Sequence, residues 1–408
     1  MVRVPATSAN LGPGFDAFGL ALALHDQVEA RVTGGGLDVA ARGESEETAG
    51  NGERHLVVRA MRAAFDAMGG QPAGIALRCV NAIPHGRGLG SSAAAVVSGI
   101  LAARALVADG AGRLPDADVL RLAADLEGHP DNAAACLAGG LTVAWRPSVP
   151  GAGAVGLLRL DVLDAITAVV CVAPTAMATN EARLALPASV PHAGAAANAA
   201  RSALLLAALT SDPAVLFDAT EDYLHQRYRA AAQPATAELL GRLRRVGVAA
   251  VVSGAGPSIL ALGVADEPPG LAAVDSIARE TGIAWRVTPL KVDRQGATVL
   301  TGETGVPRPG TTWHGRSPNQ APEPGVLPAG GSTQGRAASP ARLGPQSRDA
   351  VGSYGVKLGA APGAPPSGQV LARHLPRYRL HGRLRPVIPC QIFGPPLSPR
   401  RCGRGIWP

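Results

Sequence analysis

The chain has few aromatic residues, few lysines and no long apolar run. Aromatic residues make up 3% of its 408 residues, so aliphatic side chains must fill any core. Lysine and arginine total 38, and Lys291 and Lys357 are the only lysines among them. No unbroken apolar run reaches the roughly 18 residues of a membrane-spanning helix, and the N-terminus becomes polar too early for a secretory signal. We therefore expect no membrane span and no secretion.

The cysteines also form no recognisable framework. They are Cys79, Cys136, Cys171, Cys390 and Cys402, an odd number with no CxxC pair. Small secreted domains pair their cysteines, and structural zinc sites space them closely. Neither pattern is present, so the sequence predicts free thiols and a cytoplasmic location.

Positive charge is concentrated at the C-terminal end. The whole chain carries +7, but residues 303–408 hold 14 basic and 3 acidic residues, a net of +11, which leaves −4 for residues 1–302. Residues 303–408 also hold 18 of the 35 prolines, which predicts a disordered Pro/Gly/Arg-rich tail. An RNA-binding arm and the product of a shifted reading frame are alternative interpretations of this tail. For the folded part we expect no nucleic-acid partner.

Residues 1–302 alternate short apolar runs with amphipathic segments, a pattern typical of an α+β protein. The apolar runs predict strands at 28–32, 75–80, 141–145, 168–172, 249–253 and 259–263. The amphipathic segments predict helices at 54–68, 93–107, 117–126, 193–209, 235–246 and 271–281. A Pro/Gly-rich run at 147–156 predicts a surface connection. We therefore place one domain at 1–150, a second at 151–302 and the tail at 303–408.

The segment PHGRGLGSSAAA follows the strand predicted at 75–80 and begins the helix predicted at 93–107. Its glycines let the main chain approach a ligand closely, and the first-turn amides of a helix attract anions. No lysine follows the glycines, so this is not a Walker loop. The alternative is an ordinary glycine turn with a serine N-cap. The predicted contacts to nucleotide phosphate are Pro84, His85, Gly86, Arg87, Gly88, Leu89, Gly90, Ser91, Ser92 and Ala93.

At this loop the sequence resembles the GHMP kinases, the family of galactokinase, homoserine kinase, mevalonate kinase and phosphomevalonate kinase. The second motif of that family has the form PxxxGLGSSAA. Its other two motifs have counterparts here, PATSANLGPGFDAFGLAL at 5–22 and SGAGPSI at 253–259. The resemblance covers residues 1–300 and none of the tail. Within the family, the segments NLGPGFD, EGHPDN, TNEAR and LHQRYR are most similar to the homoserine kinase branch of actinobacterial type.

The resemblance implies a two-domain fold and a reaction. The fold is α+β, with a ribosomal-protein-like N-terminal domain that contains a left-handed βαβ unit, and a ferredoxin-like C-terminal domain. The implied reaction transfers a phosphoryl group from ATP, with Mg²⁺, to the hydroxyl of L-homoserine in threonine biosynthesis, and a homodimer is a possible assembly. Two alternatives stay open: a GHMP kinase for another small alcohol, and a non-catalytic regulator that binds ATP or an amino acid.

Glu127 and Ser92 are the metal ligands that the resemblance implies. Mg²⁺ prefers oxygen ligands and is usually held by one or two protein groups together with phosphates. A carboxylate and a hydroxyl beside a phosphate loop meet that requirement. The alternative for Glu127 is a solvated acid at the end of a helix.

Homoserine is a zwitterion with one hydroxyl, so its site needs a cation for the carboxylate and an anion for the ammonium. Arg183 and Arg229 can offer planar forks to the carboxylate, and Asp16 can pair with the ammonium. The resemblance adds Asn10, His129, Asn132 and Thr179 to this pocket. The alternatives are a surface ion pair for each arginine and a packed or helix-capping role for His129.

Phosphoryl transfer requires mainly alignment and charge neutralisation. Some relatives activate the hydroxyl with an Asp–Lys pair, but this chain has no lysine at a matching position. We therefore expect Asn132 and Thr179 to orient the hydroxyl without a strong base. Asp131 has three possible roles: a base, a support for its neighbours or a helix cap. The third motif, at 253–258, either shapes the phosphate loop or binds ligand directly.

Overall fold

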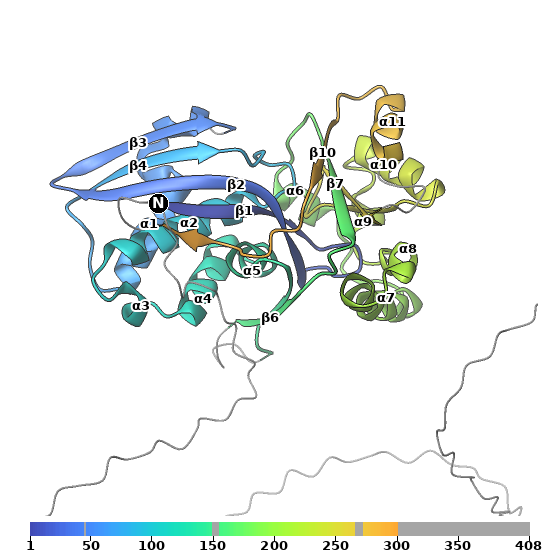
Figure 1. Cartoon of the computed structure of the whole chain (residues 1–408), viewed down its shortest axis with the longest axis horizontal. Helices are drawn as coiled ribbons and strands as arrows, with labels where there is room; N and C mark the ends of the chain where they lie inside the picture. Colours follow the sequence, from blue (N-terminus) through green and yellow to red (C-terminus); the bar gives the residue numbers. More distant parts are fainter. Residues whose placement is uncertain (45, 149–154, 266–271, 301–408) are drawn as a thin grey trace, which may run out of the picture. The chain divides into compact units, whose positions relative to one another are not determined.

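The computed structural model describes residues 1–300 except 45, 149–154 and 266–271. Its strands form two sheets that lie side by side, and each sheet is packed against its own helices (Figure 1). The predicted tail at 303–408 and the predicted boundary at residue 150 both lie outside the described residues. Within those residues, no helix combines the length and the apolar character that a bilayer crossing requires.

The first sheet has seven strands in the order β11-β1-β2-β4-β3, with β5 beside β2 and β6 beside β5. Neighbouring strands are antiparallel except β3 and β4, which are parallel. Its members are β1 (Val2–Ala9), β2 (Phe18–Thr33), β3 (Gly36–Gly43), β4 (Gly74–Asn81), β5 (Leu141–Trp145), β6 (Gly156–Leu160) and β11 (Thr298–Val299). The long strand β2 pairs with β4 through 27–33 and with β5 through 18–20.

Helices cover one face of this sheet, as Figure 1 shows. They are α1 (Leu56–Ala67), which follows the 3-10 helix η1 (Glu46–Arg54), α2 (Ser91–Leu106), α3 (Gly110–Arg113), α4 (Asp116–Glu127) and α5 (Asp131–Ala138). Helix α1 buries one stripe that includes Val57, Met61, Ala64 and Phe65, the spacing of an amphipathic helix. Helix α1 also joins β3 to β4, so these three elements form the βαβ unit that the resemblance implies.

The second sheet has four antiparallel strands in the order β10-β7-β9-β8. They are β7 (Ile166–Val172), β8 (Ala249–Val252), β9 (Ile259–Val264) and β10 (Arg286–Leu290). Between β7 and β8 lie α6 (Thr179–Leu184), α7 (His192–Thr210), η2 (Pro213–Val215), α8 (Leu216–Ala219), α9 (Gln226–Arg229) and α10 (Pro234–Arg245), and α11 (Ala272–Glu280) joins β9 to β10. This βαββαβ order is ferredoxin-like, which confirms the predicted class of the second domain.

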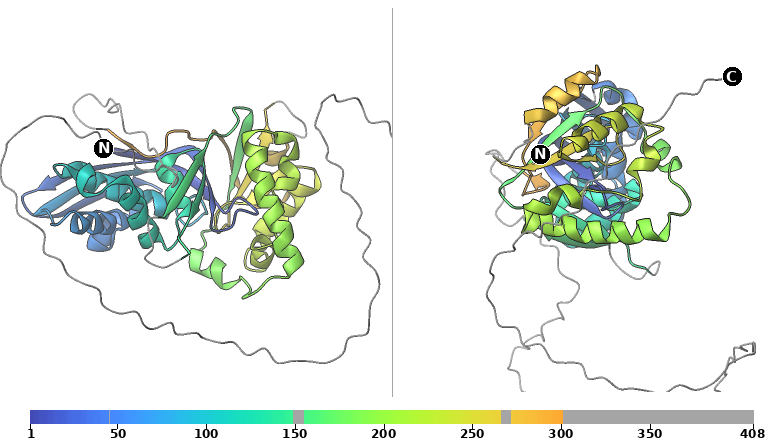
Figure 2. Two further views of the ribbon diagram at one scale, coloured as in Figure 1. Left: turned by 90° about the horizontal axis from the view of Figure 1, so that it is seen from below. Right: turned by 90° about the vertical axis from the view of Figure 1, so that its right-hand side faces the viewer.

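Both faces of the second sheet are buried, and the side chains of β7 alternate between them. Val169 and Cys171 pack with α10 and α11 in the smaller core. Ala168 and Val170 pack with α7 and α8 in the larger core, which also fills the first domain. Figure 2 shows α7 and α11 on opposite sides of this sheet. Burial on both faces explains why the strand is a continuous apolar run rather than an alternating one.

Each strand and helix predicted from the sequence coincides with an element of the same type. The pattern does not predict the short helices α3, α6, α8 and α9. Nor does it predict α5, whose sequence DNAAACLA is small and apolar after its first two residues. It also does not predict that β6 and β11 join the first sheet, where they pair with β5 and β1. The domain boundary near residue 150 stays a prediction. These pairings show that the first sheet also includes strands that follow residue 150 in the sequence.

Candidate active site

A cavity of about 800 Å³ lies between the glycine-rich segment, the start of α5, the region of α6 and the third motif. It brings together most of the residues predicted to bind nucleotide, metal or substrate. They are Asn10, Asp16, Gly86, Gly88, Gly90, Ser91, Ser92, Glu127, His129, Asp131, Asn132, Thr179, Arg183 and Arg229. Leu56 and Arg59 of α1 and Met177, Gly254 and Gly256 also line the cavity.

The glycine-rich segment ends at Gly90, which occupies the N-cap position of α2. Gly90 has φ +68°, and a Cβ built there would lie 1.9 Å from Thr7 Oγ1 and 3.0 Å from Asn132 Oδ1. Only glycine fits this backbone and this space. No side chain caps the first turn of α2, so Ser91 and Ser92 do not play the capping role of the alternative interpretation. The first-turn amides of α2 are therefore available to an anion in the cavity.

Contacts from three other segments fix the main chain of this loop. Thr7 of β1 donates its amide to Leu89 O at 3.0 Å. Ser253 donates its hydroxyl to Gly88 O at 2.7 Å, and Met177 donates its amide to Gly86 O at 2.8 Å. The third motif therefore shapes the phosphate loop, which is one of its two predicted roles.

Arg87 differs from the expectation that the whole segment faces the nucleotide. Its guanidinium donates to the carbonyl oxygens of Ala173 at 2.9 Å, Pro174 at 3.1 Å and His85 at 3.1 Å. The charge is thus used to hold the loop against the end of β7. Pro84, His85, Leu89 and Ala93 also lie outside the residues that line the cavity. For Leu89 and Ala93 the reason is that their side chains are buried in the core.

Ser92 and Glu127 lie together at the phosphate loop. Ser92 donates its hydroxyl to Glu127 Oε1 at 2.6 Å. Burial raises the pKa of Glu127, although the hydrogen bond from Ser92 opposes that change. Two oxygen donors in contact beside a loop of free amides suit Mg²⁺ that is also bound to phosphate. The described residues contain no cluster of three or more His, Cys, Asp or Glu side chains, so a divalent ion here would depend on the nucleotide for further ligands.

Asp131 organises the start of α5. Its Oδ1 accepts hydrogen bonds from His129 Nδ1 at 2.9 Å and from the Asn132 amide at 2.7 Å. The bond to Asp131 raises the pKa of His129, although burial opposes it. Thr7 donates its hydroxyl to Asn132 Oδ1 at 2.8 Å. Thr7 and Asp131 therefore fix the orientation of the Asn132 side chain and main chain. These contacts favour a supporting role for Asp131.

Arg183 and Asp16 pair with each other. Arg183 donates from Nη1 and Nη2 to the two carboxylate oxygens of Asp16 at 3.1 and 2.8 Å. Both side chains are 38% exposed. The sequence analysis assigned Arg183 to the substrate carboxylate and Asp16 to the substrate ammonium. Because the two side chains form one ion pair, a zwitterion at this site would contact the pair with both of its charges.

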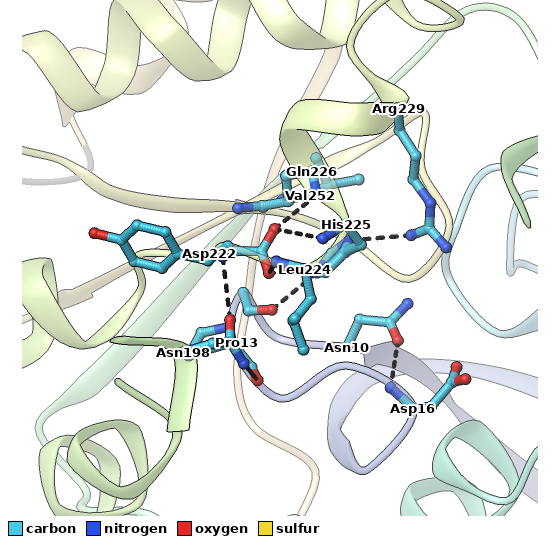
Figure 3. A network of polar contacts seen from close by, with 12 residues as sticks. Asn10, Pro13, Asp16, Asn198, Asp222, Leu224, His225, Gln226, Arg229 and Val252 are labelled. Atoms are coloured by element: carbon cyan, nitrogen blue, oxygen red, sulfur yellow. Dashed lines mark hydrogen bonds and ion pairs between the residues drawn. The ribbon is translucent and has the colours of Figure 1, made fainter. Parts of the chain in front are cut away.

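Arg229 is the one buried cation of the cavity, at 2% exposure. Its guanidinium donates to Ala182 O at 3.1 Å, His225 Nδ1 at 3.1 Å and Gly254 O at 3.4 Å. Burial and the nearby charge of Arg183 lower the pKa of Arg229, although the carboxylates of Asp16, Asp222 and Asp131 oppose that change. It forms no ion pair with any carboxylate among the residues that the structure describes. Figure 3 shows the Arg229 side chain beside His225. A buried guanidinium with no carboxylate in ion-pair contact is expected to bind an anionic group of a ligand.

Three positioning residues carry no assignment in the sequence analysis: Thr7, Asp222 and His225. Ser253 belongs to the third motif, for which shaping the phosphate loop was one of two predicted roles. Thr7 and Ser253 hold the phosphate loop, and Asp222 and His225 hold the region of Arg229. The spacing of His225 and Arg229, four residues apart, was the only local signal for one of these contacts.

The fold and the cavity are those expected of a small-molecule kinase, with the uncapped first turn of α2 and no lysine in the cavity lining. Comparison with known proteins agrees. The model of the GHMP kinases N terminal domain matches residues 55–140, and the model of the GHMP kinases C terminal domain matches residues 200–284. The chain belongs to the GHMP kinase family. It is thus a phosphotransferase that acts on an alcohol group.

Individual relatives of this chain include curated homoserine kinases. The chain is 53% identical to the homoserine kinase of Streptomyces avermitilis over 299 residues, which are 73% of this chain and 95% of the relative. It is 48% identical to the homoserine kinase of Mycobacterium tuberculosis over 270 residues, 65% of this chain and 84% of the relative. Among solved structures, homoserine kinase from Cytophaga hutchinsonii has a TM-score of 0.60 at 25% identity, and covers 72% of this chain and 95% of its own.

Proposed function

We propose that this enzyme transfers the γ-phosphoryl group of ATP to the hydroxyl of L-homoserine, in the biosynthesis of threonine. The observation that carries the proposal is the buried, unpaired guanidinium of Arg229 in the same cavity as the phosphate loop. A substrate carboxylate would supply the missing negative charge. Galactose has no carboxylate, so the cavity favours an acidic acceptor.

The ammonium of homoserine is the second group to accommodate. Asp16 is the acidic side chain on the substrate side of the cavity, and Arg183 holds both of its oxygens. A carboxylate that is already paired retains free lone pairs, so it can accept a hydrogen bond from an ammonium group. Mevalonate carries no ammonium group, which distinguishes the two acids.

ATP and Mg²⁺ complete the site. The amides at the start of α2 and the Gly86–Gly90 backbone would hold the phosphates, and Ser92 and Glu127 would hold the ion. When bound, Mg²⁺ would neutralise charge on the phosphate oxygens. Asn132 and Thr179 would orient the acceptor hydroxyl, because the cavity offers no lysine. Alignment of the reacting groups can lower a barrier by roughly 7–11 kcal/mol.

A cytoplasmic location is consistent with the free, buried thiols Cys79, Cys136 and Cys171. Burial raises the pKa of the Cys79 and Cys171 thiols to about 12, so these cysteines do not act as nucleophiles. A homodimer stays a prediction from the resemblance.

A coupled assay of ADP release tests the proposal. Purified full-length protein with Mg-ATP is given L-homoserine, mevalonate, galactose or shikimate in parallel. We expect turnover with homoserine and none above background with galactose. Preference for another alcohol would overturn the substrate assignment, and tight ATP binding without turnover of any acceptor would instead indicate a regulator.

A further inference from the structure

His225 makes two hydrogen bonds whose directions are fixed by chemistry. Its Nε2 lies 2.8 Å from Gly12 O, and a carbonyl oxygen can only accept. Its Nδ1 lies 3.1 Å from Arg229 Nη1, and a guanidinium can only donate. The imidazole is therefore neutral, with the proton on Nε2 and a lone pair directed at Arg229.

The surrounding structure gives His225 little freedom. Its side chain is fully buried and stacks on Phe15, with ring centroids 5.3 Å apart. Asp222 accepts the amides of Leu224, His225 and Gln226 at 2.9, 3.0 and 2.6 Å, which fixes the backbone on which His225 stands (Figure 3). Phe15 and Gly12 belong to the loop that also carries Asn10 and Asp16.

We propose that His225 is a positioning residue that holds Arg229 in the orientation that binds the substrate carboxylate, and couples it to the loop of the first motif. This inference rests on the proposed function, because Arg229 needs a carboxylate to bind. The geometry supports it in two ways. The three protein acceptors of Arg229 are two carbonyl oxygens and this imidazole, so His225 is the one side chain among them. The imidazole contacts the loop that bears Asp16 through Gly12 O at 2.8 Å, and Gly254 O, the longest of the three Arg229 contacts, contacts the same loop through the side chain of Asn10.

The charges that face His225 explain why it can stay neutral. Asp222 Oδ1 lies 3.8 Å from Nε2 and favours protonation, as does Asp16. Burial and the Arg229 charge act in the opposite direction, and burial is the largest influence, so the pKa of His225 is lowered. Arg183 faces Asp16 and Arg229 from α6. A protonated His225 would direct an N–H at the guanidinium and remove the hydrogen bond.

Two isosteric variants test the proposal in the full-length enzyme. The amide oxygen of His225→Asn can occupy the position of Nδ1 and accept from Arg229. The amide nitrogen of His225→Gln can occupy the position of Nε2 and donate to Gly12, but it offers nothing to Arg229. We expect His225→Gln to raise the KM for L-homoserine about tenfold or more, and His225→Asn to raise it less, with the KM for ATP unchanged in both.

A substrate without the carboxylate separates positioning from general stability. For (S)-2-amino-1,4-butanediol, in which a hydroxymethyl group replaces the carboxylate, we expect wild type and both variants to differ by less than about twofold in kcat/KM. Equal losses for both substrates, an unchanged homoserine KM in His225→Gln, or loss of ATP binding in both variants would overturn the inference, because His225 would then act only on the fold or not at all. If wild type did not phosphorylate homoserine, the proposed function itself would fail.

Discussion

At one end of the cavity the lining consists of glycines and main-chain amides, and at the other end it consists of charged side chains. We call these the phosphate end and the substrate end, after their proposed roles. The phosphate end is one continuous segment, 84–93, whose contacts come from β1, the end of β7 and the third motif. The substrate end draws Asp16, Arg183, His225 and Arg229 from three segments far apart in the chain. A triphosphate is large and highly charged, so amide dipoles can bind it without a buried cation. A single carboxylate needs a guanidinium with defined direction.

The two ends also tolerate change differently. A loop that works through its backbone is sensitive to any added atom and insensitive to side-chain charge. A guanidinium site is sensitive to the loss of that charge and of the groups that aim it. Four substitutions examine this contrast, and each is measured by steady-state kinetics on the full chain.

The largest effect is expected from Gly90→Ala. The added Cβ would meet Thr7 Oγ1 at 1.9 Å, in a backbone with φ +68°, so the start of α2 must move. We expect kcat/KM for both ATP and homoserine to fall about 10²-fold or more. Gly241→Ala, in α10 with open space around it, is the matched control and should keep full activity. Normal kinetics in Gly90→Ala would show that the phosphate loop does not bind through its backbone.

Arg229→Lys is the corresponding change at the substrate end. Lysine keeps the charge but loses the fork that reaches Ala182 O and His225 at once. We expect the homoserine KM to rise about 10²-fold while the ATP KM stays within a factor of two. Arg227→Lys is the control, because it makes the same substitution at an exposed residue of the same helix α9. A rise in the ATP KM instead would assign Arg229 to the nucleotide.

Glu127→Gln changes the carboxylate that contacts Ser92 at the phosphate loop, and should weaken the response to Mg²⁺ by about 10–100-fold. Burial raises the pKa of Glu127, so the folded protein without metal binds this proton more tightly than the unfolded chain does. The ionised carboxylate therefore costs stability at a pH above its folded pKa, and that cost decreases as the pH falls from the folded pKa to the lower pKa of the unfolded chain. We expect Glu127→Gln to melt at a higher temperature than wild type at pH 7 without metal.

The control for the Mg²⁺ response is Asp125→Asn, on the exposed side of α4, which should leave that response unchanged. An unchanged Mg²⁺ response in Glu127→Gln would exclude Glu127 as a ligand of the ion.

Asp131→Asn is expected to have the smallest effect, about tenfold on kcat. Its contacts to His129 and to the Asn132 amide describe a support rather than a base. A loss of kcat greater than about 10³-fold with unchanged binding of both substrates would instead assign the proton transfer to Asp131. That result would also place a charged catalytic side chain at the phosphate end of the cavity, where we otherwise propose that main-chain amides bind the ligand.

Much of the fold could be predicted, because the strands at 168–172 and 259–263 and the helix at 193–209 carry their own hydrophobic pattern. Helix α5 could not, since DNAAACLA is short and uniformly apolar after Asp131 and Asn132, so it shows no amphipathic period, and it packs against β1, β2 and α2. Strand β11 could not either, because two residues have no detectable period and pairing with Val2 and Arg3 alone defines them.

In the site, the glycine-rich phosphate loop could be predicted from local spacing. The orientation of Arg87, which turns away from the cavity, could not. The direction of the Arg87 guanidinium depends on carbonyl oxygens that lie 86 and 87 residues further along the chain. The Arg183–Asp16 pair and the third motif's contact with Gly88 are of the same kind. Each requires knowing which distant segment lies opposite.

The sequence by itself determined the residue types and their local backbone. Glycines at 86, 88 and 90 permit left-handed turns before a helix, and that requirement is local, so it can be recognised in a few letters. Only the tertiary structure decided that Arg229 is buried without a counter-ion and that His225 is neutral beside it. Burial and charge balance depend on neighbours contributed by the whole chain, because electrostatic energies are set by the groups and the solvent within a few ångströms, whatever their separation in sequence.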